Sequence, residues 1–395
     1  MRLLFCPAFF VGRAPFTWRL AAFYAALFVA LGVQLPFLPV WLAAKGLDAG
    51  AIGVVLAVPM VVRVFAIPLA TRSADRHDAQ RLAIVIAAGM AVLGYGALAL
   101  AQGTAAIAIV FALASASYTP MMPLADSYAL RGLGDLGRAY GPVRLWGSAA
   151  FIAGSLGAGV LIDIIAARDL IWLLVAAMVV TAATALALAP LAPRATNTRE
   201  PSSSARALLR DPAFVAAAAA AGLIQASHAV YYGFSALAWR AAGLDGAAIG
   251  ALWALAVAAE IVLFAISGRL PFAPTRLLMV GAAGAAVRWG AMALDPPTTL
   301  LPLLQCLHAL SFGATHLGAL GCVVRAAPAE LGATAQGYLA VALGLVMAAA
   351  TGVSGLLYAR SSGLAYAVMA LTAVTGGFFA LAAHRLAQGA PSLFR

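Results

Sequence analysis

Seven ionisable side chains lie inside or at the edge of long apolar stretches of this 395-residue chain, and they are the residues best suited to chemistry. They are Arg63, Asp126, Arg144, Glu260, Arg288, His308 and His316. An ionisable group within a bilayer is costly unless it is paired or hydrated, so it generally marks a binding site or a proton pathway. A carboxyl group taken out of water favours its protonated form and imidazole titrates near neutral pH, so the acids and histidines are suited to proton exchange. The arginines are suited to binding an anion.

Asp126 and Arg144 are expected at similar depths on consecutive antiparallel helices. Asp126 lies about five residues from the inner end of its helix and Arg144 about four residues into the next one, so an ion pair between them is geometrically easy. Ser148 and Ser155 fall on the same helix face as Arg144, which favours a polar pathway. The alternative is that both charged residues reach the inner membrane interface from helix ends.

Glu260 and His316 are both expected near the middle of the bilayer, and we predict that they form the proton-handling pair. Gln305, His308 and His316 share a polar face of one otherwise apolar helix, and that face is expected to line a cavity. The alternative is a protonated, hydrogen-bonded Glu260 and a neutral His316 that pack in the core. Arg288 has two open roles, namely binding a substrate anion or neutralising Glu260.

Aromatic residues accompany these groups. Gln225, His228 and Tyr232 follow one another at helical spacing, and Trp253 shares a face with Glu260. Aromatic rings next to hydrogen-bonding groups suit a planar or sugar-like ligand. Taken singly, each aromatic residue is more often part of a packed core.

The elements that must position these residues are membrane-spanning helices. Hydrophobic residues make up 64% of the chain and charged residues only 9%, whereas an average soluble domain carries about 25% charged residues. This difference excludes a soluble globular protein, and at roughly 30 to 35 residues for a span with its connection the length allows about twelve helices. We place them at residues 16–44, 49–70, 82–102, 104–131, 140–165, 168–190, 213–241, 246–270, 273–294, 299–325, 331–358 and 363–385.

The distribution of basic residues predicts the orientation. With the N-terminus in the cytoplasm, most of the 24 Lys and Arg residues fall in inner loops or at inner helix ends. Topology therefore explains the net charge of +11 without nucleic acid as a partner, and it places both termini in the cytoplasm. A polar stretch at residues 192–211, rich in Pro, Ser and Arg, is expected to be a cytoplasmic linker between six-helix halves at 1–191 and 212–395.

The sequence indicates neither a metal site nor a bound cofactor. Cys6, Cys306 and Cys322 have no CxxC spacing, and no phosphate-binding loop or HExxH motif is present. Energy for any transport would then come from an ion gradient, and we expect the proton gradient to supply it.

The loop after the second predicted span carries a family signature. Thr71, Arg72, Ser73, Ala74, Asp75, Arg76, His77 and Asp78 are followed by Arg81, and this order resembles the loop motif of the major facilitator transporters. Asp75 and Arg76 fit that motif, whereas Thr71 and Asp78 stand where glycines are expected. The resemblance implies twelve transmembrane helices in two pseudo-symmetric halves, an all-α membrane fold, with Asp75 and Arg76 in a gating loop.

Longer segments from both halves resemble one branch of that superfamily, the phenylpropionate permease-like transporters, which are related to lactose permease and to nucleoside/proton symporters. These segments are residues 37–47, 123–126, 143–148, 225–235, 241–243, 252–264, 287–290 and 305–317. The resemblance implies proton-coupled uptake and a substrate such as 3-phenylpropionic acid.

The resemblance also implies roles for individual residues. In the lactose permease relatives an acid on helix 4 and an arginine on helix 5 bind substrate. An acid on helix 8, an arginine on helix 9 and a histidine on helix 10 serve binding and proton coupling. By position these roles fall on Asp126, Arg144, Glu260, Arg288, and either His308 or His316. The acidic proton carrier that lactose permease has shortly after its helix-10 histidine is missing, because residues 317–325 contain no carboxylate. This departure shifts the expected proton site towards Glu260.

We therefore expect a secondary transporter of the bacterial inner membrane that imports a small organic substrate with a proton and works as a monomer without a protein partner. The expected substrate-binding residues are Asp126, Arg144, Arg288, Tyr232, Trp253, His308 and Gln305, and the expected coupling residues are Glu260 and His316. A neutral sugar or nucleoside substrate, with Asp126 as acceptor, and export by proton antiport are the alternatives. A membrane enzyme or sensor would need a reactive surface cluster or a sizeable soluble domain, and the sequence has neither.

Overall fold

The computed structural model describes residues 14–191, 208–269, 272–327 and 331–389, and every regular element in these ranges is helical. The first half contains α1 (Ala14–Ala44), α2 (Ala49–Arg76), α3 (Gln80–Leu100), α4 (Thr104–Tyr118), α5 (Met121–Asp135), α6 (Tyr140–Ile162), η2 (Ala167–Asp169) and α7 (Ile171–Leu186). The second half contains α9 (Pro212–Ala226), α10 (Ala229–Ala241), α11 (Gly246–Ser267), α12 (Pro274–Ala293), η3 (Thr298–Leu300), α13 (Leu301–Cys306), η4 (Ala309–Ala314), α14 (Thr315–Ala326), α15 (Gly332–Arg360) and α16 (Ser362–Gly389).

The helices have the length and composition of membrane spans. Among the described residues, eleven helical segments are long and apolar enough to cross a bilayer. α12 is 20 residues long and falls outside this set, since Arg276 and Arg288 make it less apolar. With α12 as the twelfth span, the arrangement agrees with the predicted all-α membrane fold.

Three of the predicted spans are interrupted helices, at 104–131, 213–241 and 299–325. In the first, Pro120 separates α4 from α5, because proline has no backbone N–H for the helical ladder. In the second, the Ser227 hydroxyl and the His228 ring bind carbonyl groups of the last turn of α9. The third contains the π-helical turn η4, in which the backbone takes one extra residue into the turn.

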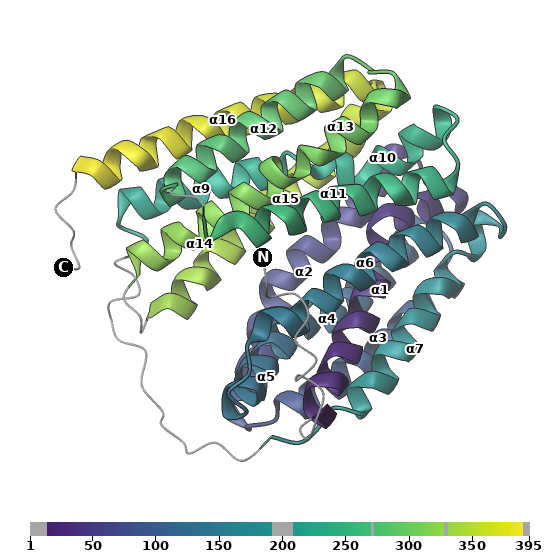
Figure 1. The fold of residues 1–395 in the computed structure, drawn as a ribbon. Helices are drawn as coiled ribbons and strands as arrows, with labels where there is room; N and C mark the ends of the chain where they lie inside the picture. The colour runs from purple at the N-terminus through teal and green to yellow at the C-terminus, as the bar shows by residue number, and fades with distance from the viewer. Residues whose placement is uncertain (1–13, 192–207, 270–271, 328–330, 390–395) are drawn as a thin grey trace.

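The helices form two bodies, α1 to α7 and α9 to α16 (Figure 1). Contact between the bodies is made chiefly by α2 with α15, α6 with α11, and α1 with α10. Most of the predicted linker at 192–211 lies outside the described residues. At its end, Asp211 caps α9, because its Oδ1 accepts the Ala213 N–H at 2.9 Å.

Small residues bring the two bodies into backbone contact near one end of these helices. A Cβ atom at Gly53 of α2 would overlap Gly355 of α15, and one at Gly159 of α6 would overlap Gly246 of α11. The Ser155 hydroxyl of α6 also donates to a backbone carbonyl of α11, that of Gly250, at 3.1 Å. Only residues without a large side chain permit helices to approach so closely.

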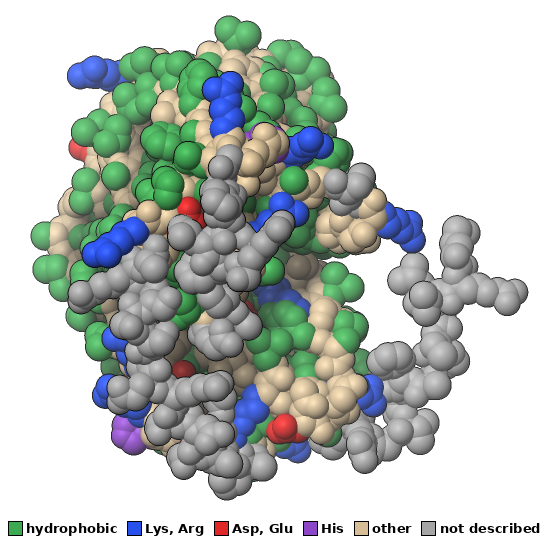
Figure 2. Space-filling model, turned by 90° about the vertical axis from the view of Figure 1, so that its left-hand side faces the viewer, with side chains coloured by type: hydrophobic (Ala, Val, Ile, Leu, Met, Phe, Trp, Pro, Cys, Tyr) green, Lys and Arg blue, Asp and Glu red, His purple; other side chains and the backbone are tan. Residues whose placement is uncertain are grey.

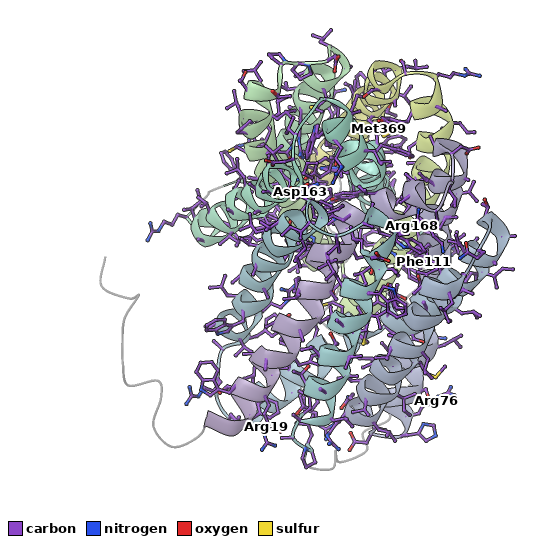
Figure 3. All side chains as sticks on the ribbon, turned by 90° about the vertical axis from the view of Figure 1, so that its right-hand side faces the viewer. Arg19, Arg76, Phe111, Asp163, Arg168 and Met369 are labelled. Atoms are coloured by element: carbon purple, nitrogen blue, oxygen red, sulfur yellow. The ribbon has the colours of Figure 1, made fainter. Side chains whose placement is uncertain are left out.

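A carboxylate joins the bodies at the same end. Asp163, just after α6, accepts the Gly246 N–H at 2.7 Å and the Ala247 N–H at 3.3 Å, and so satisfies free donors at the start of α11. Arg240 lies 3.7 Å from the same carboxylate. In Figure 3, Asp163 lies where the first body meets the second, whereas Arg19 and Arg76 lie at the opposite end of the first body.

The opposite end is open. In Figure 1 the ribbons of α5 and α14 lie well apart, towards the left of the view. Figure 2 views that side and shows the surface hollowed between the two bodies. Arg19 and Arg76 lie at this end of the first body, and basic residues are expected on the inner side of the membrane.

Candidate functional site

The polar cluster of the first body is centred on Asp126 of α5. Its Oδ1 atom accepts hydrogen bonds from the Tyr24 hydroxyl at 2.6 Å and from the Tyr140 hydroxyl at 2.8 Å. Arg144 of α6 lies over the ring of Phe28 at 4.1 Å and over that of Tyr24 at 5.6 Å. Asp126 and Arg144 are therefore neighbours of the same tyrosine, as their predicted depth suggested. No ion pair joins them directly among the described residues.

Two features of this cluster leave it able to bind a further group. Both tyrosines donate to one oxygen of Asp126, so its Oδ2 atom has no hydrogen-bond partner among the described residues. Arg144 is half-buried and has ring contacts but no hydrogen bond in the same ranges. The cluster thus retains one acceptor and several donors that are not in use.

The polar cluster of the second body is centred on Arg288 of α12, which is completely buried. Its Nη2 atom donates to Gln305 Oε1 at 2.7 Å, and its Nη1 atom donates to His308 Nδ1 at 2.9 Å and to Ser311 Oγ at 3.3 Å. The guanidinium also lies 4.6 Å from the ring centre of Tyr231. The structure thus brings together Arg288, Gln305 and His308, which were all predicted site residues, and adds Ser311.

His308 connects Arg288 to Glu260. Its Nε2 atom lies 3.5 Å from Glu260 Oε2, on the other side of the ring from the contact with Arg288. A guanidinium can only donate, so His308 Nδ1 accepts and the ring proton resides on Nε2, facing the carboxylate. Arg288 thereby selects the tautomer of His308 that stabilises an ionised Glu260.

The same network continues to the break between α9 and α10. His228 Nδ1 faces the carbonyl groups of Ile224 and Gln225 at 3.2 and 3.1 Å, so this nitrogen donates. His228 Nε2 is then the acceptor for the Ser311 hydroxyl at 3.0 Å. The hydrogen bond between His228 and Ser311 therefore joins the break between α9 and α10 to the π-turn η4. Hydropathy alone does not indicate this contact.

His316 does not contact Glu260. Its ring stacks on Phe312 at 6.0 Å and lies 6.2 Å from Phe264, and no hydrogen bond to it is present among the described residues. The predicted Glu260–His316 pair is replaced by a Glu260–His308 contact in this conformation. Arg144 of α6 and Glu260 of α11 lie on two helices that are in contact across the bodies.

The predicted aromatic residues pack around the Arg288 network. Trp253 stacks on Tyr231 at 4.4 Å and lies 6.0 Å from Tyr232. Tyr232 in turn stacks on His228 at 5.6 Å. Tyr231 separates Trp253 from Arg288, so Trp253 forms part of the wall of the network.

The predicted gating loop is the end of a helix. α2 continues to Arg76, which places Asp75 and Arg76 in its last turn. Asp75 Oδ1 accepts a hydrogen bond from Gln80 at 3.2 Å. Nearby, Arg131 of α5 pairs with Asp78, so this motif ties three helices of the first body together. In the described ranges, no three His, Cys, Asp or Glu residues are placed to hold a metal ion.

Comparisons with known proteins agree on a transporter fold. Residues 17–368 match a family described as "MFS_1 like family". The chain is 32% identical over 365 residues to a probable 3-phenylpropionic acid transporter of Escherichia coli (strain K12), covering 91% of this chain and 96% of that protein. It is 31% identical over 382 residues to a maltose permease of Geobacillus stearothermophilus, covering 92% and 95% respectively.

Solved structures share the fold at low sequence identity. A variant of the nucleoside transporter NupG aligns with a TM-score of 0.79 at 17% identity, covering 93% of this chain and 99% of that chain. A bacterial homologue of the lysosomal transporter Spinster, solved in an inward-facing and unoccupied conformation, aligns with a TM-score of 0.74 at 13% identity, covering 95% and 98%. These likenesses support the arrangement of helices described above.

Proposed function

The chain belongs to the MFS_1 like family of membrane transporters, and we propose that it imports a small aromatic carboxylate together with a proton. In this proposal the protein lies in the bacterial inner membrane with both termini in the cytoplasm. The open end of the structure then faces the cytoplasm, and the glycine contacts close the outer side.

The observation that carries the proposal is the contact series Glu260, His308, Arg288, in which His308 Nε2 lies 3.5 Å from Glu260 Oε2. The Nε2–H group of His308 faces Glu260 when the carboxyl group is ionised, and a protonated Glu260 no longer needs that donor. Protonation of this one carboxyl group therefore changes both its charge and its interaction with His308 at the boundary of the two bodies. Symport follows if Glu260 takes up its proton while the outer side is open and releases it towards the cytoplasm.

The choice of an aromatic carboxylate rests on the residues between the bodies and on the relative at 32% identity, which is described as a 3-phenylpropionic acid transporter. Arg144, which lies over the ring of Phe28, offers a cation on the first body, and Tyr232 offers an aromatic ring on the second. Arg288, by contrast, is buried and bonded, so we assign it to holding His308 instead of to binding substrate.

A neutral sugar is the second candidate, and one specific observation favours it. Asp126 Oδ2 has no hydrogen-bond partner among the described residues, and Asp126 and Arg144 both contact Tyr24, so the cluster offers an acceptor and donors that suit a hydroxyl group. The relative at 31% identity is described as a maltose permease.

The test is uptake into proteoliposomes with an imposed inward proton gradient. Labelled 3-phenylpropionate, maltose and a nucleoside are compared, each with and without an uncoupler. We expect accumulation of the aromatic acid that the uncoupler abolishes. If only a neutral compound accumulates, the substrate assignment changes and the proton-coupled mechanism stands. Accumulation only in inside-out vesicles acidified within would show export and overturn the proposal.

A further inference from the structure

We propose that Arg63 of α2 binds the negative charge of the substrate. The inference rests on the proposed function, because it requires the substrate to be an anion. It assigns the anchoring role to an arginine that neither polar cluster uses.

Arg63 lies on the face of α2 that points away from lipid. Val54, Val61, Phe65 and Leu69 are 53%, 44%, 65% and 69% exposed, and these four residues fall on one face of the helix. At about 100° per residue, Arg63 lies on the opposite face. This face is directed into the protein, and Arg63 itself is partly buried.

The part of the chain that the structure describes contains no partner for the charge of Arg63. Its Nε atom lies 3.4 Å from the position that a Cβ atom on Gly344 of α15 would take, so the side chain rests on a helix of the other body. No hydrogen bond or ion pair to Arg63 is present among the described residues. A guanidinium in the middle of a span without a partner is costly, so it is expected to serve a ligand.

Arg63 lies at the depth of the other groups between the bodies. It is ten residues further along α2 than Gly53, which is about 15 Å from the contact with Gly355. Glu260 is ten residues along α11 from Gly250, again about 15 Å from a contact between the bodies. Arg144 is eleven residues from Ser155 of that same contact, at about 16 Å. All three therefore lie at one level on the open side of the glycine contacts.

Among the arginines at this level, Arg63 is the one that has no hydrogen bond, ion pair or ring contact with a described residue. Glu260 is linked through His308 to Arg288. Asp126 shares the contacts of Tyr24 with Arg144. Two acids thus face three arginines, so one positive charge has no counter-charge, and Arg63 is the arginine without a hydrogen bond, ion pair or ring contact among the described residues. A substrate with one carboxylate supplies the missing charge, whereas a neutral sugar would leave it unmatched.

The experiment measures binding of labelled 3-phenylpropionate to the purified full-length protein, in competition with unlabelled acid and with its neutral amide, 3-phenylpropionamide. The variants are Arg63→Gln, Arg63→Lys and Arg72→Gln. Arg72 is exposed near the end of the same helix, so its replacement removes an equal charge at a distance from the level of Arg63. Thermal melting confirms that each variant is folded.

For Arg63→Gln we expect acid binding to weaken by at least about thirtyfold, as for other truncated buried charge pairs, while amide binding changes by less than about threefold. Arg63→Lys should retain most of the preference for the acid, and Arg72→Gln should match the wild type.

Three results would decide against Arg63. Acid binding by Arg63→Gln at the wild-type affinity would overturn the inference and leave the proposed function intact. Equal weakening of acid and amide would assign Arg63 a structural role and overturn it as well. A wild-type protein that binds maltose or a nucleoside but no aromatic acid would overturn the proposed function first, and the anchoring role with it.

Discussion

The two bodies hold their polar residues in different ways. In the second body Arg288 is fully buried, and its two terminal nitrogens have the partners Gln305, His308 and Ser311. In the first body Asp126 and Arg144 are half-buried, and each has hydrogen-bonding capacity that no described residue uses. Arg288 Nε and Trp253 Nε1 of the second body also lack a hydrogen-bond partner among the described residues, but both atoms are buried. Partners on both terminal nitrogens fix the position of Arg288, whereas the half-buried, unused groups of the first body can take up a ligand. On this basis we propose that proton exchange belongs to the second body and substrate contact to the first.

The largest expected effect is that of Glu260→Gln. The amide cannot exchange a proton, so uphill accumulation driven by the proton gradient should fall to the level of simple equilibration. Exchange of labelled for unlabelled substrate should continue, because the first body is unchanged. Both are measured in proteoliposomes.

Asp295→Asn is a matched control for Glu260→Gln. Asp295 is exposed and has a φ of 51°, a conformation that asparagine tolerates. This variant should accumulate substrate as the wild type does. Preserved uphill uptake by Glu260→Gln would remove Glu260 from the coupling role.

The next effect concerns stability and compares one arginine from each body. Arg288→Ala leaves buried partners unsatisfied and should lower the free energy of unfolding by about 3–5 kcal/mol. Arg144→Ala removes ring contacts of a half-buried side chain and should cost about 1 kcal/mol or less. Thermal melting of the purified variants measures both. Similar losses of stability would contradict the difference drawn between the bodies.

The third comparison is between the two histidines of the broken tenth span. His308→Ala removes the donor that faces Glu260 and should lower the rate of proton-driven uptake by roughly tenfold or more, as expected for a hydrogen bond to a charged group. His316→Ala removes a ring that only stacks on Phe312 in this conformation, so its effect should stay below about threefold. The reverse order would restore the predicted Glu260–His316 pair as the working one.

Much of the fold follows from composition and length, because a bilayer leaves few alternatives to apolar helices of about 20 residues. The breaks at Pro120 and His228 do not follow, since the apolar character of a span changes little where one or two residues leave the helical ladder. The glycines are an intermediate case. Gly159 and Gly355 form close contacts between helices, and a glycine permits such a contact, but which helix each one meets depends on tertiary packing.

The candidate site was predictable where a regular helix was the correct geometry. Gln305 and His308 both reach Arg288 because α13 and the residues after it keep them on one side. The predicted alignment of Gln305 with His316 assumed a regular helix between them. The π-turn η4 lies between them and adds one residue to the winding, which rotates His316 by about 100°.

The sequence does not indicate Tyr24 and Tyr140 as site residues, because a tyrosine near a helix end is usually a packing residue. Their contact with Asp126 depends on how α1, α5 and α6 pack, which the spacing of residues along one helix does not reveal.

The smallest expected effects are those of replacing these two tyrosines. They test how much the hydrogen bonds to Asp126 contribute to the stability of the first body. Tyr24→Phe removes one of two hydrogen bonds to Asp126 Oδ1 and keeps the ring next to Arg144, so it should cost about 0.5–1.5 kcal/mol of stability. Tyr140→Phe should have a similar effect, because either hydroxyl alone still satisfies that oxygen. The double variant should lose more than the sum of the two, since Asp126 then lacks both donors. Melting temperatures of the three variants and the wild type form the cycle, and strict additivity would show that the two hydroxyl groups act independently on Asp126.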